Sequence, residues 1–307
     1  MAIIRSAAVL LLREALKRPF SGVALTLGRT RILLTEADWK ELASREGFQL
    51  HEAAHQEFED CQLVQGGVAI SDHYFFESLG FTELHAMDNS DFEDADFIHD
   101  LNSVPAPKPL RDRFDVIFNY GTIEHVFHVP NALQNIHDML KVGGRVIHAA
   151  PTSNHPDHGF YMLSPCWFVD YYTANRYDIA DIKVVRFREK TMFKTAEFLD
   201  YPKDGSLGWS TGSFDDQVYG VVATLVKTAD SQAHLIPQQN CYQQLWNEHN
   251  STTPLERSSE KDLAEQQPVS LIRRCYRRVK NLPLIGGLAR MAGAVARRLV
   301  RTPRLKW

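Results

Sequence analysis

The stretch FDVIFNYGTIEHVFHVPNALQNIHDMLKVGGRVIHAAP, residues 114–151, decides the fold. It opens with the apolar run 114–120 and closes with a second apolar run at 144–151, and both runs predict strands. Between them, residues 131–144 carry apolar side chains at helical spacing and end in two glycines, which predicts a helix. A strand, a helix and a strand in this order predict a crossover between two parallel strands.

Outward from this unit, strand and helix patterns alternate along most of the chain. Further strands are predicted at residues 22–28, 83–88, 97–102, 181–187 and 218–228. Further helices are predicted at 4–18, from Glu36 onward with Thr35 as N-cap, and at 71–81 with Gly80 near the C-cap. These elements predict an α/β, doubly wound domain over residues 1–230, with helices on both faces of a mostly parallel sheet.

The composition is that of a globular protein with an uneven distribution of charge. The chain has 307 residues, of which 44% are hydrophobic, and this excludes collagen-like and wholly disordered proteins. Four cysteines without a CxxC pair, and the lack of an apolar run long enough for a membrane span or signal peptide, predict a cytoplasmic protein. Residues 266–307 contain 11 Lys and Arg and no Asp or Glu, so the net charge of -4 conceals an acidic body.

The basic end is predicted to be a separate part of the chain. Residues 231–267 are polar and predict a linker, whereas residues 268–307 place apolar residues at helical spacing between Arg and Lys. This pattern predicts a basic amphipathic helical tail. Its partner is the acidic body of its own chain or of an oligomer, or else an anionic membrane surface to which the protein would bind peripherally. Nucleic acid is less favoured, because aromatic residues in the tail are limited to Tyr276 and Trp307.

The ends of the predicted strands carry a family resemblance. Gly28 ends the first strand, Asp88 the second and Asp100 the third, and Asn119 leads into the run GTIEHV after the fourth. With the helix, the glycine pair and the apolar strand that follow, this order resembles the class I S-adenosylmethionine (SAM)-dependent methyltransferases over residues 80–175. It is similar in particular to a bacterial subgroup in which GT-E-HV precedes a DHGFY-type segment, here residues 157–161.

The resemblance implies a Rossmann-like sheet of seven strands, the last one antiparallel, with SAM as cofactor. Asp88 would accept hydrogen bonds from the two ribose hydroxyls, which suits a carboxylate because it only accepts. Asp100 and the backbone N–H of Leu101 would face the adenine. Gly28 and Asn119 complete the implied cofactor site.

Three features depart from the family pattern. The turn TLGRTR, residues 26–31, keeps only Gly28 of the usual glycines, so the side chains that follow would crowd a backbone that approaches the ligand. Only twelve residues separate Asp88 from Asp100, which is too short for a full crossover helix. Residues 29–70 intervene before the next family helix and predict an inserted subdomain.

Three residues are candidates for the methyl-transfer site. Glu124 and His125 are expected at the start of the helix after the fourth strand, where one of them would border the acceptor; stabilisation of the helix dipole is the alternative role. His158 lies in the segment that caps the cleft in the subgroup and is the candidate general base. The histidines at 125, 128, 148, 155 and 158 lack the spacing of well-characterised metal sites, so we predict no metal site.

The function implied is O-methylation of a sugar, a glycan or another small bacterial metabolite. Such a reaction needs alignment of the acceptor and a base for its hydroxyl. The alternative is a noncatalytic methyltransferase-like module that scaffolds a membrane-proximal assembly, which the TLGRTR turn and the basic tail favour. Metal-dependent hydrolysis by the histidines is a third, less supported hypothesis. The sequence leaves the oligomeric state open.

Overall fold

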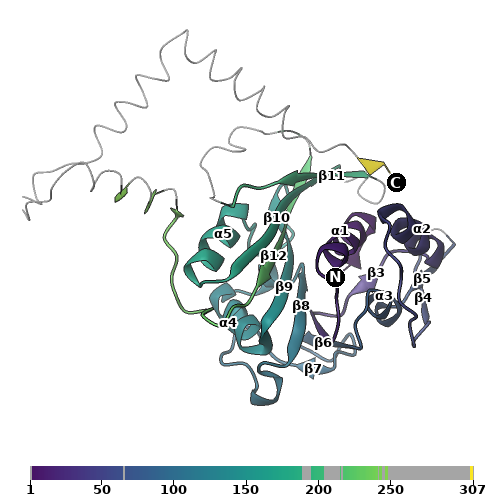
Figure 1. The fold of residues 1–307 in the computed structure, drawn as a ribbon, viewed down its shortest axis with the longest axis horizontal. Helices are drawn as coiled ribbons and strands as arrows, with labels where there is room; N and C mark the ends of the chain where they lie inside the picture. The colour runs from purple at the N-terminus through teal and green to yellow at the C-terminus, as the bar shows by residue number, and fades with distance from the viewer. Residues whose placement is uncertain are drawn as a thin grey trace, which may run out of the picture. The chain divides into compact units, whose positions relative to one another are not determined.

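The computed structural model describes residues 2–64, 66–188, 195–203, 215, 217–240, 242–243, 246–247 and 305–306. Its main sheet consists of β2 (Val23–Leu27), β6 (Glu83–Asp88), β7 (Phe97–Ile98), β8 (Phe114–Tyr120), β9 (Leu140–Ser153), β10 (Asp178–Phe187), β11 (Thr195–Asp200), β12 (Val218–Val226) and β13 (Leu305–Lys306). In space these strands lie in the order β13-β11-β10-β12-β9-β8-β2-β6-β7 (Figure 1).

The sheet has a parallel half and an antiparallel half. Strands β7, β6, β2, β8 and β9 pair in parallel, whereas β12 is antiparallel to both β9 and β10. Each strand predicted from the sequence is present, and the last of them, β12, is antiparallel as the resemblance implies. The expectation of seven mostly parallel strands is nevertheless wrong, because the described residues form a nine-stranded sheet whose edge beyond β9 is antiparallel. Strand β11 was missed because it lies within a segment rich in loop-forming residues.

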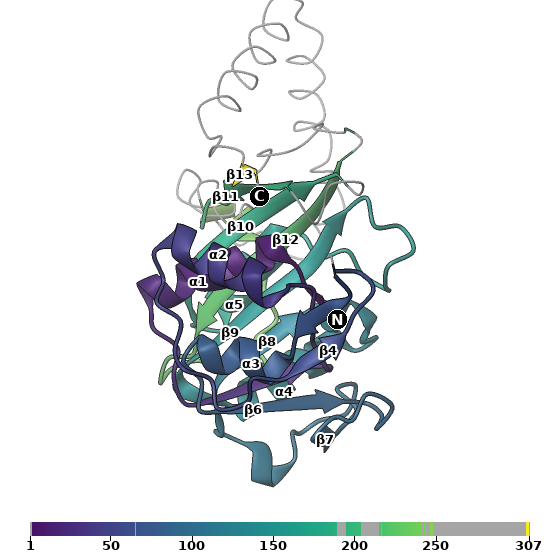
Figure 2. The ribbon, with the colours of Figure 1, turned by 90° about the vertical axis from the view of Figure 1, so that its right-hand side faces the viewer.

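Helices cover both faces of the sheet, as a doubly wound fold requires (Figures 1 and 2). One face carries α1 (Arg5–Lys17), α2 (Glu36–Glu46) and α3 (Asp72–Ser78), and the other carries α4 (Val129–Met139) and α5 (Pro165–Ala174). Neighbouring strand residues point to opposite faces. Phe118 of β8 therefore packs in the hydrophobic core on the side of α1, α2 and α3, and Ile117 packs in the core on the side of α4 and α5. Helix α5 was not predicted, because five consecutive buried residues, 168–172, leave it without a helical polar period.

The segment 29–70 packs onto α1 and the sheet. Its elements are β3 (Arg31–Ile32), which pairs with β1 (Ala2–Ile3), then α2, and the antiparallel pair β4 (Phe58–Asp60) and β5 (Val68–Ile70). Helix α2 begins at the predicted N-cap, where Thr35 and Asp38 form a capping box. Its buried Trp39 belongs to the same hydrophobic core as the sheet residue Phe118, and α2 lies beside α1 (Figure 1). The predicted insertion therefore shares its core with the rest of the fold.

The predicted linker and tail are only partly covered. Near the start of the linker, the backbone of Leu235 exchanges hydrogen bonds with the side chain of Asn175, and Tyr171 donates to the carbonyl of Ala233. The helical tail predicted at residues 268–307 lies outside the described residues, apart from the two-residue strand β13. Among the residues that the structure describes, every helix is too short or too polar to cross a bilayer.

A buried ion pair fastens α1 to the centre of the sheet. Arg145 of β9 is 8% exposed and donates to Glu14 Oε1 at 2.7 Å, and its guanidinium also donates to the carbonyls of Arg18 and Pro19 at 2.8 and 3.0 Å. Glu14 itself is 6% exposed and also accepts from the Arg18 side chain. Removing the carboxylate charge would leave a buried guanidinium with carbonyl partners alone, which is costly.

Replacing Glu14 by Gln should therefore lower the free energy of unfolding by about 3 kcal/mol, measured by urea denaturation. The matched control is Glu46→Gln, which breaks the pair between Arg13 of α1 and Glu46 of α2. Since the Arg13 side chain is 35% exposed, against 10% for that of Arg145, this change should cost less, about 1 kcal/mol. Equal losses in the two variants would contradict the role assigned to the Glu14–Arg145 pair.

Candidate active site

The carboxyl ends of the parallel strands meet at one edge, where α/β sheets bind ligands. Gly28, just after β2, has a φ of +80° and donates its N–H to the carbonyl of Met87 in β6 at 2.6 Å. Thr122, after β8, donates its hydroxyl to the carbonyl of Leu27. These two bonds bring the ends of β2, β6 and β8 together and place Gly28 next to the strand end that carries Asp88.

The acidic residues predicted for the cofactor lie along this edge. Asp88 is half-buried, and its Oδ1 accepts from the backbone N–H groups of Asn89 and Ser90 at 2.6 and 3.3 Å, which uses one of its two oxygens. Asp100 is exposed, and hydrogen bonds from Asn102 hold the pKa of its carboxyl below the usual value. The side chain of the adjacent Leu101 is buried in the core. The chain from Asp88 to Asp100 contains only β7 and loop, as its short length predicted.

In the turn after β2, the side chains that follow Gly28 each have a defined environment. Arg29 forms an ion pair with the buried Asp72 at 3.1 Å and donates to the carbonyl of Asp94 at 3.2 Å. Thr30 is buried, and Arg31 belongs to β3. The turn is thus anchored to α3 and to the loop after β6.

Asn119 is buried at the end of β8 and holds the turn that follows. Its Oδ1 accepts from the N–H groups of Thr122 and Ile123 at 3.2 and 3.0 Å, and its amide group bonds His148 Nδ1 at 3.0 Å. The other ring nitrogen of His148 bonds the hydroxyl of Tyr172 at 2.5 Å. Burial lowers the pKa of His148 to about 3, so this imidazole is neutral at physiological pH. The side chain of Asn119 therefore stabilises the turn. Its predicted role in cofactor binding would be indirect, through the position of that turn.

Glu124 is fully buried without a hydrogen-bond partner for either carboxyl oxygen. It lies in a short 3-10 turn, Ile123–His125, and α4 begins only at Val129, so the expected position at a helix start is wrong and the helix-dipole alternative loses its basis. Two glycines make room for it. A Cβ at Gly121 would lie 3.3 Å from Glu124 Oε1, and one at Gly159 would lie 2.9 Å from the Glu124 carbonyl oxygen. Burial raises the pKa of Glu124 to about 7.

Three histidines gather around this carboxyl group. His158 Nε2 lies 3.5 Å from Glu124 Oε1, and the His158 ring is 5.2 Å from the ring of His125 and 5.5 Å from that of His155. Burial lowers the pKa of His125 and of His155, which favours their neutral forms. Glu124, His125 and His158 offer ligand atoms within 4.8 Å of one another, a grouping that could hold a metal ion and that the sequence spacing did not predict.

A pocket of about 220 Å³ opens beside these residues. Its lining includes Tyr120, Glu124, His155 and His158 from the strand end, the turn and the loop. The rest comes from the N-terminal segment and from β9, β10 and β12. The hydroxyl of Tyr120, both oxygens of Glu124 and Nε2 of His155 are buried without hydrogen-bond partners, and all three side chains line this pocket. Tyr120 lies between Asn119 and the run GTIEHV but was not predicted as a site residue, and neither was the N-terminal wall.

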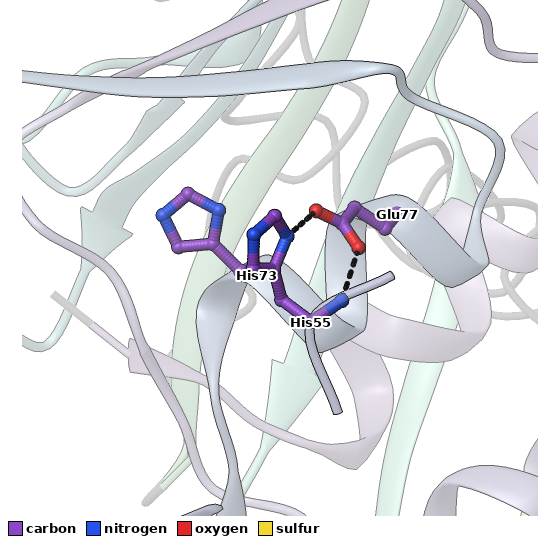
Figure 3. A group of neighbouring side chains, drawn as sticks. All are labelled: His55, His73 and Glu77. Carbon is purple, nitrogen blue, oxygen red and sulfur yellow. Dashed lines mark hydrogen bonds and ion pairs between the residues drawn. The ribbon is translucent and has the colours of Figure 1, made fainter. Parts of the chain in front are cut away.

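A second histidine–carboxylate group lies on α3 and the loop before β4. Glu77 accepts from the backbone N–H of His55 at 2.9 Å and pairs with its ring Nδ1 at 2.5 Å, and His73 lies beside them (Figure 3). The three side chains offer potential metal ligands within 4.8 Å. The spacing of His73 and Glu77, four residues apart on a helix, was the available sequence signal.

Part of the chain is similar to known proteins. Residues 71–200 match a family model described as a methyltransferase domain. No curated protein matches the chain. One similar structure is the 1,6-didemethyltoxoflavin-N1-methyltransferase of Burkholderia thailandensis with bound 1,6-didemethyltoxoflavin and S-adenosylhomocysteine, with 15% identity, 73% of this chain, 78% of that chain and a TM-score of 0.37. Another is the N-methyltransferase NodS of Bradyrhizobium japonicum WM9 with S-adenosylhomocysteine, with 12% identity, 73% and 86% coverage and a TM-score of 0.34.

Identities and TM-scores this low describe a general likeness only. The matched residues extend from the start of α3 to β11 and include Asp88, Asp100, Asn119 and Glu124. The matched residues make up less than half of the chain, and they show that this part resembles methyltransferase domains.

Proposed function

We propose that this protein transfers a methyl group from SAM to a hydroxyl group of a sugar, a glycan or another small metabolite. The observation that carries the proposal is the fully buried carboxyl group of Glu124, which has no hydrogen-bond partner and lines a pocket together with His158. A buried carboxyl group without a partner is costly in a folded protein, and a bound cation or hydroxyl would supply that partner. The family match over residues 71–200 supports methyl transfer as the type of reaction.

The residues at this edge fit SAM. Asp88 would receive the ribose hydroxyls, with Asp100 and the N–H of Leu101 at the adenine and Gly28 where the backbone approaches the ligand. The ionised carboxyl of Glu124 fits a cofactor that bears a positive charge. SAM supplies a methyl group on a positively charged sulfur, from which an acceptor oxygen can take it.

The chain's own part is to align the acceptor and receive its proton. We assign the general base to His158, whose Nε2 lies 3.5 Å from Glu124 Oε1. Glu124 would stabilise the imidazolium that forms, and His125, whose ring is 5.2 Å from that of His158, would border the acceptor. A noncatalytic scaffolding module is the second candidate, favoured by the Arg29–Asp72 pair that occupies the degenerate turn. The two candidates differ in whether SAM binds.

The test of the proposed function is binding of S-adenosylhomocysteine by calorimetry, together with the variant Asp88→Asn. Asn keeps an acceptor for the N–H groups of Asn89 and Ser90 but removes the charge, so the fold should persist. The loss of charge-assisted bonds to the ribose should cost about 2 kcal/mol, roughly a 30-fold weaker Kd. The exposed Asp91→Asn is the matched control and should bind as the wild type does. No binding by the wild-type protein at millimolar ligand would reject the enzyme and favour the scaffold.

Glu124 also predicts how stability depends on pH. Its folded pKa, about 7, exceeds that of an unfolded Glu near 4.5, so between these values the unfolded state holds fewer protons and stability falls as pH rises. Glu124→Gln removes this titration. Relative to wild type, the variant should gain up to about 3 kcal/mol between pH 5 and pH 8, measured by urea denaturation.

Two nearby groups require a control in this experiment. His125 and His158 each have a ring nitrogen within 4.8 Å of this carboxyl group. Repeating the series in His125→Gln and His158→Gln backgrounds separates the contribution of these histidines from the titration of Glu124. A difference between wild type and Glu124→Gln that stays constant from pH 5 to pH 8 would contradict the raised pKa.

We further propose that the basic residues of 266–307 bind an anionic membrane surface, which makes the protein peripheral on the cytoplasmic face. The support is the charge pattern, 11 Lys and Arg without an acidic residue. Each basic residue near such a surface contributes about 1 kcal/mol. Full-length protein should sediment with anionic liposomes at low salt, and exchanging Arg273, Arg274, Arg277 and Arg278 for Gln should weaken this at least tenfold. Sedimentation that ignores salt and these changes would mean that the tail binds protein instead.

A further inference from the structure

The pocket beside Glu124 has an apolar wall that a sugar does not need. Apart from Ser6 and Gly220, its lining from the N-terminal segment, β10 and β12 consists of aliphatic and aromatic side chains, among them Ile4, Ala7, Leu10, Val185, Phe187 and Val221. Two elements from opposite ends of the domain supply this wall, the first helix and the antiparallel half of the sheet. An apolar body of a ligand would bury its surface here and gain from the removal of water.

The polar groups of the same pocket are few. The side chains that can form hydrogen bonds are Ser6, Tyr120, Glu124, His155 and His158. Tyr120, Glu124 and His155 contribute buried polar atoms without a protein partner. All three residues come from the end of β8, the turn after it or the loop after β9, whereas the N-terminal segment, β10 and β12 add only Ser6 to the side chains that can form hydrogen bonds. A sugar ring carries a hydroxyl on most of its carbons, and each hydroxyl left without a partner on burial weakens binding.

The volume of the pocket limits the size of the ligand. Ligand pockets for drug-sized molecules span roughly 300–1,000 Å³. The pocket here is about 220 Å³, which matches a single ring better than a chain of sugars.

The acidity of the hydroxyl group limits which acceptor the site can activate. A phenol loses its proton with a pKa of about 10, as tyrosine does. An aliphatic hydroxyl is closer to water, whose pKa is about 15.7. The carboxyl group of Glu124, whose pKa burial raises to about 7, is therefore a base far better matched to a phenol.

Resting on the proposed function, we propose that the methyl acceptor is a small phenol, one aromatic ring with few other polar groups, bound with its hydroxyl toward Glu124 and His158 and its ring against the apolar wall. In the transfer, the phenolic proton passes to the His158–Glu124 pair. The phenol oxygen forms a bond to the methyl carbon while the carbon–sulfur bond breaks and its electron pair goes to sulfur. The products are an aryl methyl ether, S-adenosylhomocysteine and a proton.

The test compares three probes with the full-length protein by calorimetry, each with and without S-adenosylhomocysteine: 4-methylphenol, 4-methylcyclohexanol and methyl glucoside. We expect the phenol to bind at least tenfold more tightly than either of the others. The absorbance of the bound phenol should also shift toward that of phenolate as pH rises, at a lower pH than in solution. Equal or tighter binding of the glucoside would overturn the proposal.

Two variants locate the binding. Ala7→Leu fills the apolar wall and should weaken phenol binding at least tenfold while leaving S-adenosylhomocysteine binding within twofold of wild type. Leu16→Ala, on the exposed side of the same helix, is the matched control and should change neither. Phenol binding that survives Ala7→Leu would place the ligand elsewhere and overturn the proposal.

The same data separate this proposal from the proposed function. Binding of S-adenosylhomocysteine without preference for the phenol would leave the methyltransferase and reject the phenol. Preferential phenol binding that Ala7→Leu removes, without any binding of S-adenosylhomocysteine, would keep the pocket assignment and reject the methyltransferase.

Discussion

The site depends on two hydrogen bonds that the side chain of Asn119 accepts from the turn after β8. They fix the backbone of Thr122 and Ile123, and so they fix Glu124, which follows directly. The neutral His148 behind Asn119 completes the network inside the core, where a charged imidazole would be costly. Because the turn is bonded both to Asn119 and to the end of β2, the carboxyl group of Glu124 can stay buried without a hydrogen-bond partner.

Sequence patterns were most informative where a local rule acts alone. The capping box at Thr35 and the apolar run 114–120 each gave the correct boundary of an element, because neither depends on distant residues. The acid-ended strands also gave the carboxyl edge with Gly28 and Asp88. Helix α5 was not predicted because it is buried along consecutive residues. Strand β11 was not predicted because its local sequence pattern is weak and it is stabilised by pairing with β10.

The candidate site was predictable only in part, because its geometry depends on contacts between residues that are distant in the sequence. Glu124 and His158 were chosen from a motif, but their 3.5 Å separation and the burial of Glu124 arise from the loop 154–160 folding over the turn, as the bond from Phe160 N–H to the Glu124 carbonyl shows. The wall of the pocket comes from residues at both ends of the domain. Their association is a product of the tertiary fold, and a one-dimensional pattern does not contain it.

The division of the sheet into a parallel and an antiparallel half separates two tasks. The residues proposed for the cofactor lie at or just after the ends of β2, β6 and β7, while much of the proposed acceptor pocket lies on α1, β10 and β12. Strands β8 and β9 lie between these two groups of strands. On this proposal, substitutions on the antiparallel half would alter the choice of acceptor with little effect on the other half. A lineage of such proteins could diversify its chemistry of recognition by changing α1 and two strands, while keeping one donor and one way of holding it.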